Sequence, residues 1–440
     1  MKKLTILFCA VALIAGCKKK PTSDEKKKDD PMATAMDTMD AMDAMDTMDA
    51  MDGMDAMRPA ATRPAAMAPA GKFVTISGVT PELEKVKCGW GRCDVGVITQ
   101  AAKAEIEKQK DFQKVKVTFR KGSTSEHFKT VQNLPWLRKL DISYTMITDI
   151  APVAALVELE DFTARSLKLE KKDKDEVPLD LTPLKGLGKL KELELYGTKV
   201  ANAQVLAGHS KLEKLGFYMS YLTDVGFVKD LTNLVELDLY ACRLTSIAAV
   251  AGLTKLTKLN LYMNKSTDFT PLKGLVNLEV LWLQFTKIKD LSVLAGMTKM
   301  KKLYLNWANE IEDLSPLKAM VNMEYFDVSS KKVKDLSVVA NFKKMRTFSA
   351  DGTQIKDIKF LKGHTELTSV SIRNTKVRDI RPLAGAVKLW SVQIQGTKVK
   401  NVAALKGAKR LYSLTVSKGF PKAQLKALQN KLPKLKVHER

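Results

Sequence analysis

Four tyrosines recur at intervals of 22 residues and could supply binding energy at one surface. They are Tyr196, Tyr218, Tyr240 and Tyr262, each six places after the first leucine of an LxxLxL unit. Tyrosine presents a large rigid ring with a polar tip, and it contributes interface energy at a low entropic cost. Leucine-type anchors are needed for folding, whereas an outward tyrosine is not. The tyrosine column therefore predicts an interaction surface.

A methionine-rich segment offers a second candidate chemistry. Its methionines are spaced by three, at Met36, Met39, Met42, Met45, Met48, Met51, Met54 and Met57. Thioethers at this spacing are soft ligands that suit Cu(I) or Ag(I). No histidine accompanies them, however, and aspartate, a hard ligand, follows seven of them. Expansion of a low-complexity repeat explains the pattern equally well. Metal handling is therefore an alternative hypothesis, and we expect no cofactor.

The five cysteines have different expected roles. Cys88 and Cys93 lie close together in CGWGRC, where an oxidising compartment would let them form a disulfide. Half of a metal site is the alternative for this pair. Cys242 occupies a column that holds threonine in other repeats, so we expect a small buried side chain. Cys9 and Cys17 belong to the N-terminal segment.

The N-terminal run MKKLTILFCAVALIAGC has the charged head and short apolar stretch of a bacterial secretory signal. Its end, Ile14-Ala15-Gly16-Cys17, resembles a lipobox. The resemblance implies that residues 1–16 are removed and that Cys17 carries the lipid that anchors the mature protein to a membrane. A signal peptide with a chance cysteine is the alternative. We expect a secreted protein, held at the outer membrane where the cell has one.

Replacing Cys17 with alanine should abolish incorporation of a fatty-acid probe, because the lipid would be attached through the cysteine sulfur. Metabolic labelling measures this directly. Cys9→Ala is the matched control and should keep the label. A Cys17→Ala protein that remains labelled would contradict the lipid anchor.

Histidines give no sign of catalysis in this sequence. His209 and His364 recur at one repeat position, in AGHSKL and KGHTEL, and no nucleophile or second ligand stands at a fixed spacing from either. There is also no phosphate-binding glycine loop and no zinc signature. We therefore do not expect an enzyme.

The candidate binding residues are positioned by a repeat, LxxLxLxxTxIxDIxPLxxL, with a period of 22 residues. Its first anchors are Leu137, Leu159, Leu190, Leu212, Leu234, Leu256, Leu278, Met300, Met323, Met345, Leu367, Leu389 and Leu411. Each unit encodes one short strand and a returning loop, so it can bury its apolar residues only against neighbouring units. The period predicts an α/β repeat solenoid with a parallel β-sheet on its concave face.

Aspartates recur at one repeat position, where a short side chain can accept hydrogen bonds from the backbone of the following turn. They are Asp149, Asp224, Asp268, Asp290, Asp313, Asp335, Asp357 and Asp379. Prolines follow three residues later in four repeats. We expect both columns to be structural.

Segments such as TKIKDLSVLAGMTKMKKLYL and TKVRDIRPLAGAVKLWSV resemble the 22-residue leucine-rich repeats of the internalin family. The resemblance covers about residues 137–416. It implies a leucine-rich repeat horseshoe with short 3-10 or loop returns, which binds proteins through its concave sheet without catalysis. The sequence departs from cell-wall-anchored members in its lipobox-like N-terminus and in lacking a C-terminal sorting signal. Adhesion to host cells is therefore not carried over.

The segments around the array complete the predicted organisation. Residues 1–16 are the expected signal peptide, and residues 17–71 the expected disordered tether. An N-terminal cap over 72–136 contains DVGVITQAAKAEIEKQKDF, which predicts an amphipathic helix, and FQKVKVTF, which predicts a strand one unit early. About thirteen repeats fill 137–416, and the C-terminal cap over 417–440 is predicted to hold a closing helix and a final strand.

Other positions that should point outward from the sheet also hold aromatic residues, so the tyrosine column is predicted to be part of a larger aromatic surface. The additional rings are Trp282, Phe285, Tyr304, Trp307 and Tyr325. Because neighbouring strands lie ~4.8 Å apart, four tyrosines form a ladder about 15 Å long. Nine exposed rings would exceed the apolar patch that monomers tolerate without purpose. Two alternatives remain: the rings stabilise the sheet by stacking on one another, or they were copied during repeat expansion.

The net charge of +24 would ordinarily suggest a polyanionic partner. Inward bases, namely Lys139, Arg165, Lys214, Lys258, Lys302 and Arg373, are roughly balanced by inward acids. Those acids are Asp141, Glu192, Glu194, Glu236 and Asp238. The excess lysine therefore belongs to the loops and the C-terminal cap. A near-neutral aromatic groove suits a protein or a glycan, the basic outer face suits an anionic envelope lipid or polysaccharide, and we expect no nucleic-acid partner.

Overall fold

The computed structural model describes residues 73–76, 87–89, 92–94, 107, 116–119, 121–172 and 175–440. Residues 69–440 belong to one unit of the chain. The predicted signal peptide, the lipidated Cys17 and the tether lie outside the described residues. So does the predicted amphipathic helix over residues 94–112, apart from Asp94 and Glu107.

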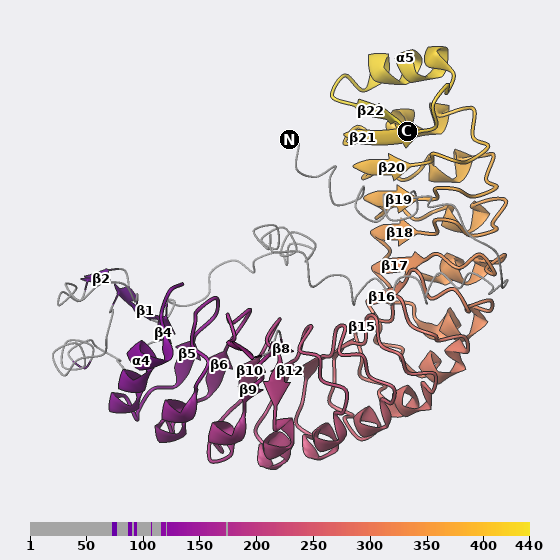
Figure 1. The fold of residues 1–440 in the computed structure, drawn as a ribbon. Coiled ribbons are helices and arrows are strands. Elements are labelled where there is room, and N and C mark those ends of the chain that lie inside the picture. The colour runs from indigo at the N-terminus through magenta and orange to yellow at the C-terminus, as the bar shows by residue number, and fades with distance from the viewer. Residues whose placement is uncertain are drawn as a thin grey trace, which may run out of the picture. The chain divides into compact units, whose positions relative to one another are not determined.

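One sheet of 16 parallel strands runs through the repeat array and forms the inner side of the arc that the array traces (Figure 1). Its strands, in spatial order, are β1 (Phe73–Ile76), β4 (Lys116–Phe119), β5 (Lys139–Asp141), β6 (Asp161–Thr163), β10 (Glu192–Glu194), β12 (Lys214–Gly216), β13 (Glu236–Asp238), β14 (Lys258–Asn260), β15 (Val280–Trp282), β16 (Lys302–Leu305), β17 (Tyr325–Val328), β18 (Thr347–Ser349), β19 (Ser369–Ser371), β20 (Ser391–Gln393), β21 (Ser413–Val416) and β22 (Lys436–Glu439). The predicted parallel sheet is confirmed. Equivalent repeat positions pair with one another, as Leu237 pairs with Leu259.

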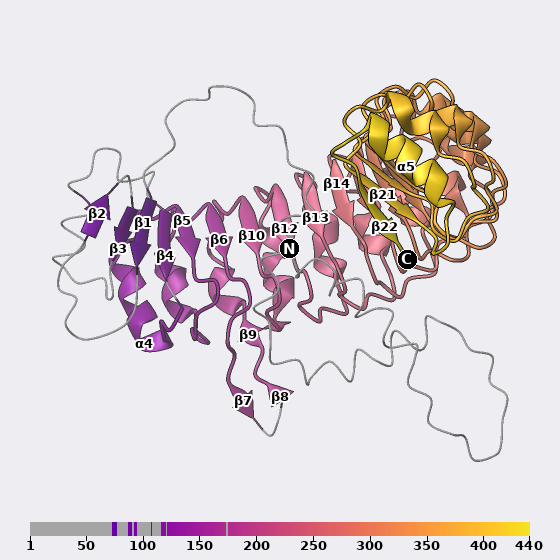
Figure 2. The same cartoon turned by 90° about the horizontal axis from the view of Figure 1, so that it is seen from above.

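Three two-stranded sheets flank the main one. β2 (Lys87–Gly89) and β3 (Arg92–Asp94) form an antiparallel pair, and β9 (Leu179–Asp180) runs parallel to β11 (Val200–Ala201). The charged insertion after Leu159 contains the antiparallel pair β7 (Lys171–Lys172) and β8 (Asp175–Glu176). Figure 2 shows this pair extending away from the main sheet.

Short 3-10 helices return the chain along the outer side of the arc (Figure 1). They are η5 (Lys129–Asn133), η6 (Ala151–Ala155), η7 (Thr182–Leu184), η8 (Ala203–Gly208), η9 (Gly226–Asp230), η10 (Ala248–Val250), η11 (Thr270–Gly274), η12 (Leu291–Leu294), η13 (Ser315–Ala319), η14 (Ser337–Asn341), η15 (Lys359–Leu361), η16 (Arg381–Leu383) and η17 (Ala403–Gly407). The α-helices are α4 (Ser125–Phe128) and α5 (Lys422–Lys431). No helix in the described part of the chain combines the length and apolarity needed to cross a membrane.

Each aspartate of the predicted column starts a return. All eight carboxylates accept a hydrogen bond from the backbone N–H two residues later, at 2.7–3.2 Å. The four prolines stand at the first or second position of η6, η11, η13 and η16, where a missing N–H costs nothing. The structural reading of both columns is confirmed.

The ends of the array agree with the prediction where they are described. β4 adds a strand one unit early, and α5 and β22 close the C-terminal end. β1 extends the sheet by one strand beyond β4, and the sequence pattern did not predict it.

A polar column lies inside the array, parallel to the apolar core. Ser220 Oγ donates to Leu195 O at 2.5 Å, and the side-chain nitrogen of Asn264 donates to Leu239 O at 2.8 Å. Cys242 occupies the same column, with its Sγ 3.0 Å from Phe217 O. Burial raises the pKa of the Cys242 thiol to about 12, so it stays protonated. The prediction that Cys242 is a small buried side chain is confirmed.

Asn264→Ala should lower the free energy of unfolding by roughly 1–3 kcal/mol. The change leaves the buried Leu244 N–H without the acceptor that Asn264 supplies. It also removes one of two donors from the Leu239 carbonyl, which keeps only the Cys242 N–H at 3.4 Å. Cys242→Ser is the matched control, because a hydroxyl can donate to the same carbonyl. Denaturant unfolding of both variants measures the effect, and equal stability for the two would contradict this role of the column.

Candidate interaction surface

The predicted tyrosine column forms a stack on the concave face of the sheet. Ring centroids are 5.7 Å apart between Tyr196 and Tyr218, 4.1 Å between Tyr218 and Tyr240, and 4.4 Å between Tyr240 and Tyr262. The last two pairs are nearly parallel, with interplanar angles of 16° and 11°. Side chains six places after the first anchor thus meet across neighbouring strands because equivalent positions are in register.

Two further rings continue this stack. Tyr262 lies 5.3 Å from Phe285, and Phe285 stacks on Trp307 at 5.6 Å. We call the series from Tyr196 through Tyr262 to Phe285 and Trp307 the first ladder.

A second ladder consists of Trp282, Tyr304 and Tyr325. Trp282 and Tyr304 lie four places after the first anchor of their repeats, and Tyr325 lies two places after its anchor. Its centroid distances are 5.5 Å from Trp282 to Tyr304 and 4.3 Å from Tyr304 to Tyr325. The structure therefore brings all nine predicted rings together, in two ladders rather than one continuous patch.

The expectation of nine exposed rings is wrong. Trp307 is 47% exposed, but Tyr304 is only 9% exposed and the other seven rings are half-buried. The reason is that each ring covers the face of its neighbour. Such pairs contribute about 0.5–1.5 kcal/mol each beyond area burial, so stacking within the sheet accounts for part of the column.

What the ladders present outward is therefore mainly ring edges and hydroxyl groups. The hydroxyls of Tyr218, Tyr240 and Tyr262 hydrogen-bond along the stack. Burial raises the pKa of Tyr262 to about 12 and raises the pKa values of Tyr218 and Tyr240 further. These phenols remain neutral at physiological pH, and they can donate or accept hydrogen bonds.

Charged groups on this face form pairs between neighbouring strands. Glu194 is buried and contacts both Arg165 and Lys214. Burial alone would raise the pKa of Glu194, but hydrogen bonds from Lys214 and Arg165 outweigh it and hold the pKa below its ordinary value. The Arg165 guanidinium also lies 5.1 Å from the Tyr196 ring centroid. Other pairs are Lys116–Asp141, Lys139–Asp161, Lys258–Glu236 and Arg373–Asp351. Five of the six predicted inward bases thus have an acidic partner, although two of those partners, Asp161 and Asp351, were not among the predicted acids.

The position seven places after the first anchor adopts a left-handed backbone in most repeats. Its φ is 54° at Met219, 56° at Met263, 54° at Phe285 and 65° at Trp307. Side chains disfavour this conformation by roughly 1–2 kcal/mol, which is why glycine or asparagine usually holds it. In this column Gly197, Gly352, Asn374 and Gly396 do so. The sequence analysis did not predict this backbone strain. The signal was the recurrence of glycine at this repeat position, in Gly197, Gly352 and Gly396.

Gly352→Ala should lower the free energy of unfolding by about 1 kcal/mol, because φ is 71° there and the added methyl group meets no atom within 4 Å. Ala241→Gly, at φ 52°, should raise it by a similar amount. Chemical denaturation of the two variants is the measurement. Changes of the same sign in both would show that left-handed strain does not govern this column.

The other predicted site residues lie apart from the ladders. Cys88 and Cys93 are register partners in the β2–β3 pair, and their disulfide stays a prediction. His209 and His364 are buried, with Nε2 2.9 Å from Leu184 O and 3.1 Å from Val339 O respectively. Both histidines thus join neighbouring repeats. Within the described ranges, no three His, Cys, Asp or Glu side chains gather as metal ligands.

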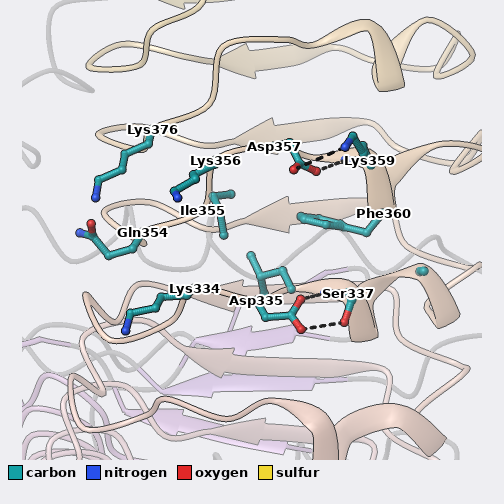
Figure 3. Close-up of a pocket in the computed structure, with 12 residues that line it drawn as sticks. Lys334, Asp335, Ser337, Gln354, Ile355, Lys356, Asp357, Lys359, Phe360 and Lys376 are labelled. Carbon is teal, nitrogen blue, oxygen red and sulfur yellow. Dashed lines mark hydrogen bonds and ion pairs between the residues drawn. The ribbon is translucent and has the colours of Figure 1, made fainter.

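A shallow groove of about 770 Å³ lies among the loops that follow β17, β18 and β19. Figure 3 shows Lys334, Lys356 and Lys376 along one end of it, with Asp335 and Asp357 at the other. The two carboxylates are engaged by backbone N–H groups of the following returns.

A family profile described as leucine-rich repeats, in two copies, matches residues 232–274 and 276–319. These two segments are leucine-rich repeats, and the rest of the array repeats the same strand and 3-10 return. Its fold is similar to that of the internalin InlF from Listeria monocytogenes, with 24% identity and a TM-score of 0.53, over 62% of this chain and 86% of InlF. A search of curated proteins finds no match.

Two further solved structures share the leucine-rich repeat fold. A leucine-rich repeat protein from Leptospira interrogans is 16% identical, with a TM-score of 0.62, over 78% of this chain and 92% of its own. The functional domain of InlJ from Listeria monocytogenes, described as including a cysteine ladder, is 20% identical with a TM-score of 0.54. That match covers 71% of this chain and 64% of InlJ. The predicted leucine-rich repeat horseshoe fold is confirmed.

Proposed function

We propose that this chain is a lipid-anchored envelope protein that binds another protein through the two aromatic ladders of its concave face. The observation that carries the proposal is the convergence of nine aromatic side chains on the strands from β10 to β17. The lipobox-like sequence around Cys17 supports the anchor. The leucine-rich repeat fold supports a binding module by analogy alone.

The stacking geometry favours a protein over a glycan. A sugar that packs on an aromatic residue needs a free ring face, but Tyr240 is covered on both sides by Tyr218 and Tyr262. Ring edges and hydroxyl groups instead suit the mixed apolar and hydrogen-bonding surface of a protein.

Backbone strain at the first ladder supports a role beyond stability. Met219, Met263, Phe285 and Trp307 occupy left-handed positions where glycine would be more stable. Trp307 is also exposed, so its burial does not compensate the strain. Strained residues with large apolar side chains are expected where a surface has been shaped for contact.

Binding of an anionic envelope polymer to the basic outer face is a second candidate. Lys334, Lys356 and Lys376 gather at one end of the loop groove, and the nearby carboxylates are already occupied (Figure 3). Such binding would depend on charge and would weaken as salt rises. Metal handling by the methionine segment concerns residues outside the described part of the chain.

The triple variant Tyr218→Ala, Tyr240→Ala, Trp282→Ala should lose partner binding. Each central anchor of an interface contributes about 2 kcal/mol or more, or about 30-fold in affinity. The partner is first captured with the full lipoprotein from its own cell envelope and identified, and its affinity for each variant is then measured.

The control triple Tyr221→Ala, Trp390→Ala, Tyr412→Ala removes rings that lie outside both ladders and are more exposed. It should bind normally, and thermal unfolding should show that both triples are folded. Normal binding by the ladder triple would reject the proposal. Binding that falls only as salt is raised would favour the basic outer face.

A further inference from the structure

Three hydrogen-bond acceptors lie on, or just after, the consecutive strands β15, β16 and β17 that carry the second ladder. Asp327 on β17 is the register partner of Tyr304 on β16 and of Ser349 on β18. Gln284 and Asn306 follow Trp282 and Tyr304 by two residues, which places them on the same face of the sheet. We call Gln284, Asn306 and Asp327 the acceptor cluster.

Both amide groups of the cluster have oxygens without a partner. Gln284 is only 8% exposed, and neither its Oε1 nor the Oδ1 of Asn306 has a hydrogen-bond donor among the described residues. A buried acceptor without a partner costs roughly 1–3 kcal/mol. Two such groups side by side, between two aromatic ladders, point to a ligand that supplies N–H donors once the amides turn toward it.

Asp327 adds a carboxyl group with which no base forms an ion pair in the described part of the chain. Arg373, the base that acts on it, pairs with Asp351 at 2.6 Å. Tyr304, Tyr325 and Asp351 also face Asp327. Burial, together with the nearby Asp351, raises the pKa of Asp327 to about 7, although the hydrogen bond to Ser349 and the charge of Arg373 act to lower it.

We propose that the acceptor cluster is the docking site for an arginine side chain of the protein partner. The inference rests on the proposed function and names the chemistry of its central contact. A guanidinium carries five donors in a rigid plane, so it can meet a carboxylate and two amide oxygens together. It can also pack against rings such as Tyr325 and the exposed Trp307. Lysine is the weaker candidate because its compact ammonium loses more hydration and offers fewer donors.

The cluster makes binding pH-dependent with a definite sign. Below pH 7 the free Asp327 is protonated and neutral, whereas above pH 7 it is ionised and attracts a cation. A bound guanidinium favours the ionised form, so affinity should rise by about tenfold between pH 6 and pH 8.

The test uses the full chain and a small probe, so it does not depend on knowing the partner. N-acetyl-arginine methylamide is titrated at millimolar concentration, with the fluorescence of the tryptophans near the cluster as the readout. N-acetyl-citrulline methylamide, which keeps the shape without the charge, is the matched probe. The arginine probe should bind at least about tenfold more tightly and should show the predicted pH dependence.

Variants assign the binding to the cluster. Asp327→Asn should abolish both the preference for arginine and the pH dependence. Glu236→Gln, which removes an acid already paired with Lys258, should leave both unchanged. Gln284→Leu should weaken binding of the arginine probe without lowering the melting temperature, because it removes a buried amide that has no partner for its oxygen. If the Gln284→Leu protein does not fold, the Asp327→Asn variant alone tests the site.

Equal binding of the two probes, no arginine binding, or an unchanged Asp327→Asn variant would overturn the inference. Each of these outcomes leaves the role of the aromatic ladders intact, because partner capture by the Tyr218, Tyr240 and Trp282 triple is measured separately. The opposite result is also distinguishable. If the triple variant still captures the partner while the arginine probe binds at Asp327, the proposed function of the ladders is rejected.

Discussion

Each 22-residue unit buries its apolar anchors only against the units on either side, and this constraint fixes parallel strands in register along the array. Leu237 lies beside Leu259, and Leu259 beside Leu281, so equivalent positions become continuous columns. The core, the aspartate starts of the returns and the internal polar column are all produced by this register. So are the aromatic ladders, because a ring at one repeat position must meet its copies ~4.8 Å away.

Features that depend on repeat position alone were predictable from the sequence. The anchors, the parallel sheet, the returns, the buried Cys242 and the gathering of the aromatic side chains all follow from counting residues. The exposure of the rings was not predictable in this way. Tyr304 is buried because it lies between Trp282 and Tyr325, and that depends on rotamers and on the curvature of the sheet.

The acceptor cluster and the left-handed column show where local rules and the fold disagree. Phe285 and Trp307 adopt a backbone that glycine prefers, and Gln284 buries an oxygen without a donor. Neither feature is needed by the repeat, since other units place glycine or small polar residues at these positions. Both features lower the stability of the free protein. Unfavourable features of this kind are expected at a binding site, where contacts with a partner offset them.

Photo-crosslinking tests the concave binding face most directly. Benzoylphenylalanine is placed at Trp307, which is 47% exposed at the end of the first ladder, and separately at Val321, which is 51% exposed in the turn after η13. Irradiation of the lipoprotein in its own cells should join one protein species to position 307 and none to position 321. Crosslinking of that species at position 321 alone would contradict a concave binding site.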